Sequence, residues 1–184
     1  MALVSGNHLL LYKLRDSSWE VEEMANKEEL GQMKQQEVAK FIDVLKSEDV
    51  YSAFTATSVL GTLGESAVGP LVSMLSDEEP GMRWRAAIAL GKVGRPAVDA
   101  LIAALASETS RIPAAWALAE IGDERATPPL VQILESDSSE CCREIAAASL
   151  LKLNDQVGVQ KVEKICAKEG DKFKGVVLEA FFGT

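Results

Sequence analysis

The chain has 184 residues, of which 47% are hydrophobic and only 5% aromatic, so its apolar content is mainly alanine, leucine, valine and isoleucine. That composition favours closely packed helices. The formal net charge is −9 at pH 7, and lysines and arginines are spread singly between acidic residues. No nucleic-acid partner is expected, because such a surface repels a phosphate backbone.

Cysteine use and hydropathy indicate the compartment. Cys141, Cys142 and Cys166 are an odd number of cysteines, and no secretory signal is recognisable. This favours free thiols over a disulfide framework. The apolar run Leu9 to Leu11 is too short to span a bilayer. We therefore expect a soluble, cytoplasmic protein that does not insert into membranes.

The N-terminal region divides into two parts. Residues 1–21 do not fit the pattern that follows and are interpreted as an irregular arm or extension. A repeat domain is predicted over residues 22–184. Its first, partial unit spans about residues 22–47, with a first helix expected from Glu22 to Met33 and a second from Glu37 to Lys46.

The central region repeats one order of residues. The segment Thr57–Leu71 recurs as Ala87–Leu101 and as Ala115–Leu130, and a more divergent copy starts at Ala147. Each copy has one marker leucine: Leu60, Leu90, Leu118 and Leu150. An interval of roughly thirty residues is the length of one helix–turn–helix unit. Units are expected at about residues 50–76, 82–106, 111–136 and 141–168.

Each unit contains signals for two helices. The first helix ends at Gly64, Gly94, Gly122 or Asn154, residue types that tolerate a left-handed backbone. Prolines mark the start of two second helices, whose paired apolar positions face a core. The sequence therefore predicts an all-α fold, an α-solenoid of antiparallel helix pairs with about four to five repeats.

Arginines occupy one equivalent place in three first helices. They are Arg83, Arg111 and Arg143, and Asp77 and Asp137 precede two of them by six residues. This spacing predicts that the acidic side chain of each loop pairs with the arginine of the following first helix, fixing the geometry between repeats.

A family resemblance rests on the segment Arg83–Gly94. Its pattern, Arg-x-x-Ala-Ala-x-Ala-Leu-Gly-x-x-Gly, resembles the HEAT-like repeat of the phycobilisome lyase type, and it recurs in register from about residue 37 to the C-terminus. The resemblance implies an armadillo-like superhelix with first helices on its convex face and second helices on its concave face. Such surfaces commonly contact other proteins.

Catalytic and metal-binding residues are scarce. His8 is the only histidine, so no histidine-based triad or histidine-rich metal site can be assembled. The iron hydroxylases that this resemblance includes use repeated His-Glu pairs, which are absent here. The pairs Gly61/Gly64 and Gly91/Gly94 lack phosphate-loop spacing. No catalytic, cofactor-binding or metal-binding residue is therefore predicted.

One candidate site is an apolar band across the first helices. Phe54, Trp84 and Ile112 are equivalent positions, and Ile88 and Trp116 follow two of them by four residues. Residues four apart share a helix face. Two interpretations stay open: a partner-binding or self-association surface anchored by tryptophan, or packing between neighbouring first helices.

The C-terminal residues 171–182 are expected to form a capping helix. Its apolar residues are Phe173, Val176, Val177, Leu178, Phe181 and Phe182. They close the open end of the core or, alternatively, form a dimer surface. The favoured function is a non-enzymatic scaffold or adaptor that binds another protein, with homodimerisation through the exposed ends or the band as one form of it. The alternative is a bilin lyase, or lyase subunit, acting on phycobiliproteins.

Overall fold

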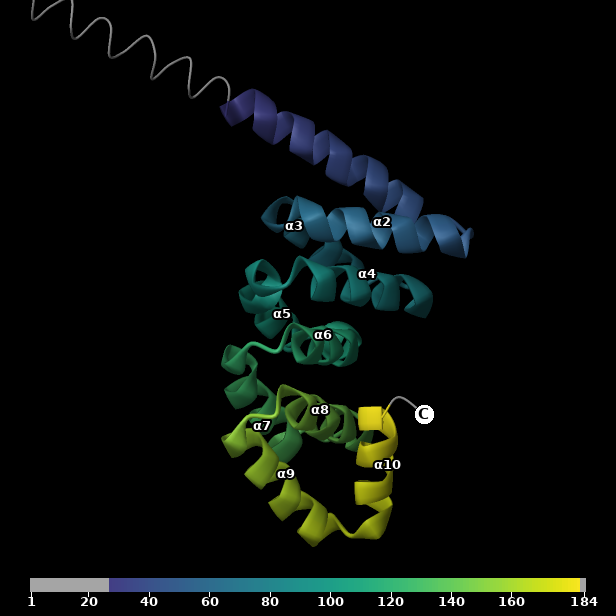
Figure 1. Cartoon of the computed structure of the whole chain (residues 1–184). Helices are drawn as coiled ribbons and strands as arrows, with labels where there is room; N and C mark the ends of the chain where they lie inside the picture. The colour runs from purple at the N-terminus through teal and green to yellow at the C-terminus, as the bar shows by residue number, and fades with distance from the viewer. Residues whose placement is uncertain (1–26, 183–184) are drawn as a thin grey trace, which may run out of the picture.

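The computed structural model describes residues 27–182, and all the regular structure in that range is helical. The helices form two layers in one stack (Figure 1). First helices make one layer: α2 (Val50–Leu63), α4 (Pro80–Val93), α6 (Glu108–Ile121), α8 (Glu140–Leu153) and α10 (Asp171–Phe182). Second helices make the other: α3 (Glu65–Met74), α5 (Val98–Ala104), α7 (Thr127–Ser136) and α9 (Gln156–Glu169). The predicted all-α solenoid is confirmed.

Neighbouring units are held together in a regular way. Each first helix packs against the next first helix, and each second helix packs against the first helix of the following unit. Short 3₁₀ turns, Arg95–Ala97 and Glu124–Ala126, lead into α5 and α7. The predicted arm, residues 1–21, lies outside the described residues, as do His8 and Leu9 to Leu11.

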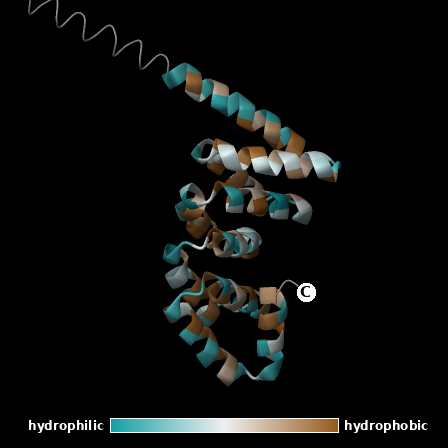
Figure 2. Cartoon of the chain, viewed as in Figure 1, coloured by the Kyte–Doolittle hydropathy of each residue, from teal (hydrophilic) through white to brown (hydrophobic). Residues whose placement is uncertain are grey.

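The partial unit at the N-terminal end differs from its prediction. Residues 27–45 form one uninterrupted helix, so the expected break between Met33 and Glu37 is wrong. The intervening Lys34, Gln35 and Gln36 all favour helix, and neither glycine nor proline interrupts them. Only the C-terminal part of the segment, with Val38, Ile42 and Leu45, joins the core. Figure 2 shows hydrophilic residues along much of the remainder.

Positive backbone angles end the first helices as the sequence predicts. The φ angles are 61° at Gly64, 77° at Gly94, 72° at Gly122 and 53° at Asn154. Pro96 lies in the 3₁₀ turn before α5, and Pro128 lies in the first turn of α7. At these positions the missing N–H has no helical partner to lose.

The core is a continuous row rather than a globule. The four marker leucines, at 60, 90, 118 and 150, are fully buried. They belong to one apolar cluster that runs from Val38 to Val177. Such a row is the expected core of a repeat protein, in which each unit contacts its neighbours only.

The predicted arginine ladder exists with different partners. Nη1 of Arg111 lies 2.7 Å from Oδ2 of Asp137, and Nη2 of Arg143 lies 3.0 Å from Oε1 of Glu169. Each arginine therefore pairs with an acid near the end of its own unit, and the expected pairing of Asp137 with Arg143 is wrong. Asp137 is turned because its Oδ1 accepts the Ser139 N–H, 2.8 Å away.

Asp77 also directs its carboxylate into its own loop, as Asp137 does. Its Oδ1 accepts the Glu79 N–H at 2.9 Å, and Arg83 donates to its backbone carbonyl, also at 2.9 Å, and not to its carboxylate.

In the part of the chain that the structure describes, no helix is long and apolar enough to cross a membrane.

Candidate functional site

The apolar band predicted from the repeats lies across three consecutive first helices. Phe54 is on α2, Trp84 and Ile88 are on α4, and Ile112 and Trp116 are on α6. Phe54 is 62% exposed, Trp84 39% and Ile88 38%, whereas Ile112 and Trp116 are half-buried. The layer of first helices therefore carries large apolar groups in contact with water.

The two tryptophans are brought together between α4 and α6. Their ring centroids are 5.9 Å apart and their planes meet at 84°, an edge-to-face contact. Aromatic pairs prefer this arrangement, which adds about 0.5–1.5 kcal/mol to the burial of their surface. Trp116 also packs against the core. The pair thus fixes Trp84 in one orientation while leaving part of its ring exposed.

Phe54 joins the band through a cation rather than through a ring. The Nζ of Lys92 on α4 lies 5.4 Å from the Phe54 centroid. At the other end, the Nζ of Lys152 on α8 lies 5.9 Å from the Trp116 centroid and also pairs with Glu120. Lysines thus lie over aromatic rings at both ends of the band, within the range of cation–π attraction.

A shallow hollow of about 450 Å³ opens beside Trp84. It is lined by Trp84, Ile112 and Pro113, with Arg83, Glu108 and Thr109 as its polar part. Trp84 and Ile112, which occupy equivalent positions in successive units, therefore share one concave surface. Both interpretations of the band describe part of the geometry, since Trp116 packs between helices and Trp84 remains accessible.

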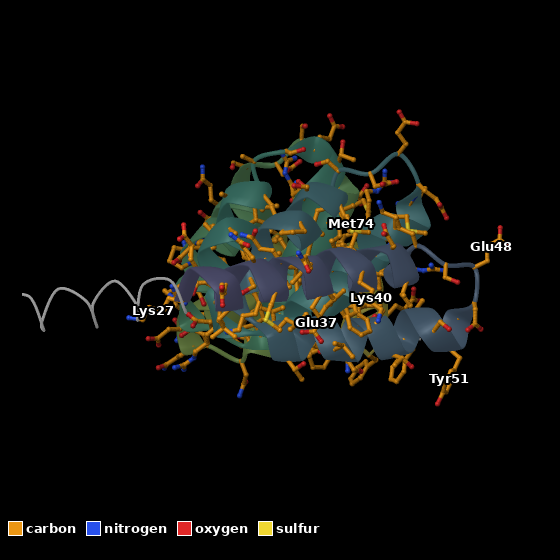
Figure 3. All side chains as sticks on the ribbon, turned by 90° about the horizontal axis from the view of Figure 1, so that it is seen from above. Lys27, Glu37, Lys40, Glu48, Tyr51 and Met74 are labelled. Carbon is orange, nitrogen blue, oxygen red and sulfur yellow. The ribbon has the colours of Figure 1, made fainter. Side chains whose placement is uncertain are left out.

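The sequence interpretation missed two exposed residues on α2. Val50 is 75% exposed and Tyr51 is 79% exposed. Tyr51 extends away from the stack in Figure 3. Their equivalents in the next unit are Pro80 and Gly81, so aligning the copies does not mark these positions as apolar. Val50 and Tyr51 lie four and three residues before Phe54 on the same helix. This spacing places them on the face of Phe54 and was the signal that could have found them.

The cysteines do not form a reactive centre. Burial raises the pKa of the Cys141 and Cys166 thiols, so both are more strongly protonated than an ordinary cysteine. Across residues 27–182, no group of three or more His, Cys, Asp or Glu side chains could hold a metal ion. The band offers apolar and cationic contacts, which suit binding.

Comparison with known families agrees with the observed stack. The family model for HEAT repeats matches residues 38–113, 71–151 and 98–181. The chain belongs to the HEAT-repeat family. No curated protein matches this HEAT-repeat chain.

Two solved structures are similar to the chain, and the first of them shares its fold. One is a chain of the complex of CpcE and CpcF of phycocyanin lyase from Nostoc sp. PCC7120, 23% identical with a TM-score of 0.58; the match covers 78% of the present chain and 96% of the other. A designed armadillo repeat protein in complex with the peptide (KR)4 is 20% identical with a TM-score of 0.40; that match covers 88% and 94% of the two chains.

Proposed function

We propose that this HEAT-repeat protein is a non-enzymatic scaffold or adaptor that binds another protein through the apolar band. The observation that carries the proposal is Trp84, held by its edge-to-face contact with Trp116 and still 39% exposed. A rigid aromatic side chain loses little conformational entropy on binding, which makes it an effective interface anchor.

The surroundings of the anchor support the same function. Ile88 and Phe54 extend the exposed apolar surface over neighbouring helices, and the hollow beside Trp84 has room for a partner side chain. Large exposed apolar side chains grouped on neighbouring helices of an otherwise acidic protein are typical of an interaction site.

The test compares exposed band residues with an exposed residue elsewhere. Proteins captured from the native cytosol by the wild type are identified, purified, and titrated by calorimetry against a Phe54→Ser/Ile88→Ser variant. Because neither side chain is in the core, we expect the melting temperature to stay within about 2 °C of wild type. The dissociation constant should rise at least roughly 30-fold, as it does when interface anchors are removed.

The matched control is Val157→Ser on α9, which removes an apolar side chain that is 57% exposed but distant from the band. It should bind the same partner with wild-type affinity. Equal binding by the band variant would contradict the proposal, and so would a large loss of its thermal stability, since that would make the band a packing element.

A second candidate function is a bilin lyase or lyase subunit acting on a phycobiliprotein. The similarity to a chain of the CpcE–CpcF complex of phycocyanin lyase favours it. Incubation of the purified protein with bilin and apo-phycobiliprotein tests it directly. A covalent adduct or a chromophore absorption spectrum would support the lyase; their absence with the protein present would remove it.

A further inference from the structure

The last helix, α10, occupies the place of a first helix in a fifth unit. It packs against α8 as α8 packs against α6, and it contacts α9 as earlier first helices contact the preceding second helix. Phe173 and Val177 are buried, 2% and 1% exposed, one repeat after the buried Cys142 and Ala146. These buried positions therefore align α10, residue by residue, with the first helix of the preceding unit.

Two residues of α10 are much more exposed than their equivalents in the earlier units. Leu178 and Phe181 stand one repeat after Ala147 and Leu150, which are both fully buried. In α10 the same positions are 38% and 36% exposed. The marker-leucine position faces the core in four units and faces water in the fifth, because no second helix follows α10 within residues 27–182.

An open groove of about 470 Å³ continues this exposed face between α8, α9 and α10. Its apolar walls include Leu151, Val177 and Leu178, and Cys166 lines it from α9. Cys166 stands at the position of Leu75, Leu105 and Leu134, which are larger side chains and at most 5% exposed. The smaller residue leaves room that a leucine fills elsewhere. Figure 2 shows hydrophobic residues toward the C-terminal end of α10.

The opposite end of the stack has the polar outer face expected of a cap. Glu37 stands at the position of Ala67, Ala97 and Ala126, each fully buried. Glu37 and Lys40 are both exposed on the N-terminal helix, which lies toward the viewer in Figure 3. A second copy docking this segment head-to-tail on α10 would bury a carboxylate where the repeat has alanine, at a large cost in desolvation.

We propose that the exposed face of α10 binds an amphipathic helix of a partner protein, with apolar residues at positions i, i+1 and i+4. The chain's own repeats supply the template: Leu130, Val131 and Leu134 of α7 have this spacing, as do the apolar residues of α3 and α5. The bound helix completes the fifth pair. This proposal rests on the proposed function of binding another protein. The α10 face can nevertheless fail to bind a helix while the band still binds its partner.

A second copy of α10 is a poorer occupant than a partner helix. The exposed large apolar side chains of this twelve-residue helix are Leu178, Phe181 and Phe182. A stable dimer removes roughly 800 Å² of surface from each partner. An α10-to-α10 contact offers little beyond these three groups, whereas a helix laid along α10 also fills the groove against α9.

The probe is a hydrocarbon-stapled, fluorescein-labelled peptide of residues 123–137, which carries the α7 face. The fluorescence anisotropy of this peptide is measured while the 184-residue protein is titrated into it. A peptide with Leu130→Ser and Leu134→Ser is the control. We expect saturable binding of the first peptide only. Phe181→Ser should weaken it at least roughly 30-fold, and Leu178→Ser should weaken it in the same direction.

The band variant Phe54→Ser separates this surface from the other, because it should leave peptide binding unchanged. Absence of saturable binding to the wild-type protein would overturn the proposal. Wild-type affinity in both α10 variants would also overturn it, as would a dimer in light scattering that Phe181→Ser abolishes, since a second copy would then be the occupant.

Discussion

Arg111 on α6 and Asp137, just after α7, form a salt bridge in which Nη1 lies 2.7 Å from Oδ2, and their side chains are only 21% and 8% exposed. The same guanidinium donates through Nε to the Leu105 carbonyl, 2.9 Å away. One side chain therefore connects the C-terminal ends of two successive second helices. A cation at those carbonyls also complements the helix dipole.

Replacing Arg111 should destabilise the fold markedly. In Arg111→Gln, the Asp137 carboxylate loses its cation while remaining shielded from water, and the Leu105 carbonyl at the end of α5 loses a donor. We expect the free energy of unfolding to fall by about 3 kcal/mol, measured by urea denaturation. Arg83→Gln is the control, because Arg83 donates to the backbone carbonyl of Asp77 and not to a carboxylate. This substitution should cost about 1 kcal/mol. Equal losses would contradict this interpretation.

Gly61 lies at a close contact between the first helices α2 and α4. A Cβ built at Gly61 would lie 2.9 Å from the Cβ of Lys92 and 3.3 Å from its carbonyl carbon. Gly61→Ala must therefore push α4 away from α2. We expect a loss of about 1–2 kcal/mol, because the strain of overpacking exceeds the gain in helix propensity.

Gly175→Ala is the matched control for that substitution. Gly175 lies in α10, and a Cβ there would have nothing within 4 Å. Relief of glycine's entropy cost should raise stability by about 0.5–1 kcal/mol. Thermal unfolding of both variants therefore gives shifts of opposite sign; a stabilising Gly61→Ala would show that the two helices have room to spare.

Asp123 should make stability depend on acid pH. Its carboxylate accepts from Nε and Nη2 of Arg125 at 2.9 and 3.1 Å, and these hydrogen bonds hold its pKa below the ordinary value of 3.8. A carboxyl with a lowered folded pKa stabilises the protein above its unfolded pKa. That stability is lost as the pH falls through the folded pKa.

The variant for this test is Asp123→Asn, which keeps an N-cap acceptor for the Arg125 N–H and removes the charge. Urea denaturation at a series of pH values should show wild type more stable than the variant at neutral pH. The difference should shrink as the pH drops below 3.8. A difference that stays constant down to strongly acidic pH would contradict the role of the charge.

Repetition explains which parts of the fold were predictable. Leu60 and Leu90, and the glycines that follow them, recur at a fixed interval, so comparison of the copies locates both helices and the turn between them. Residues 27–45 have no complete copy to compare with, and the break proposed near Met33 was wrong. The prediction of the arginine partners was wrong for another reason. Asp137 precedes Arg143 but also lies near Arg111, and the hydrogen bond within its own loop directs its carboxylate toward Arg111.

The candidate site was predictable only in part. Aligning the units placed Trp84 and Ile112 at one position, but the contact between Trp84 and Trp116 depends on how far α4 and α6 slide past each other. No pattern within one repeat specifies that distance. The exposure of Phe181 likewise follows from the absence of a covering helix within residues 27–182, since its sequence position is that of a buried leucine.

The helix-ending glycines should differ in their tolerance of asparagine. Gly122 has φ 72° and ψ 25°, the left-handed region in which Asn154 already lies, whereas Gly94 has φ 77° and ψ −142°. A Cβ would meet nothing within 4 Å at either glycine, so only the backbone conformation separates them. Gly94→Asn should lose about 2–3 kcal/mol of unfolding free energy and Gly122→Asn less than about 1 kcal/mol. Chemical denaturation of the two variants measures both values, and equal losses would show that the two turns relax to a common conformation.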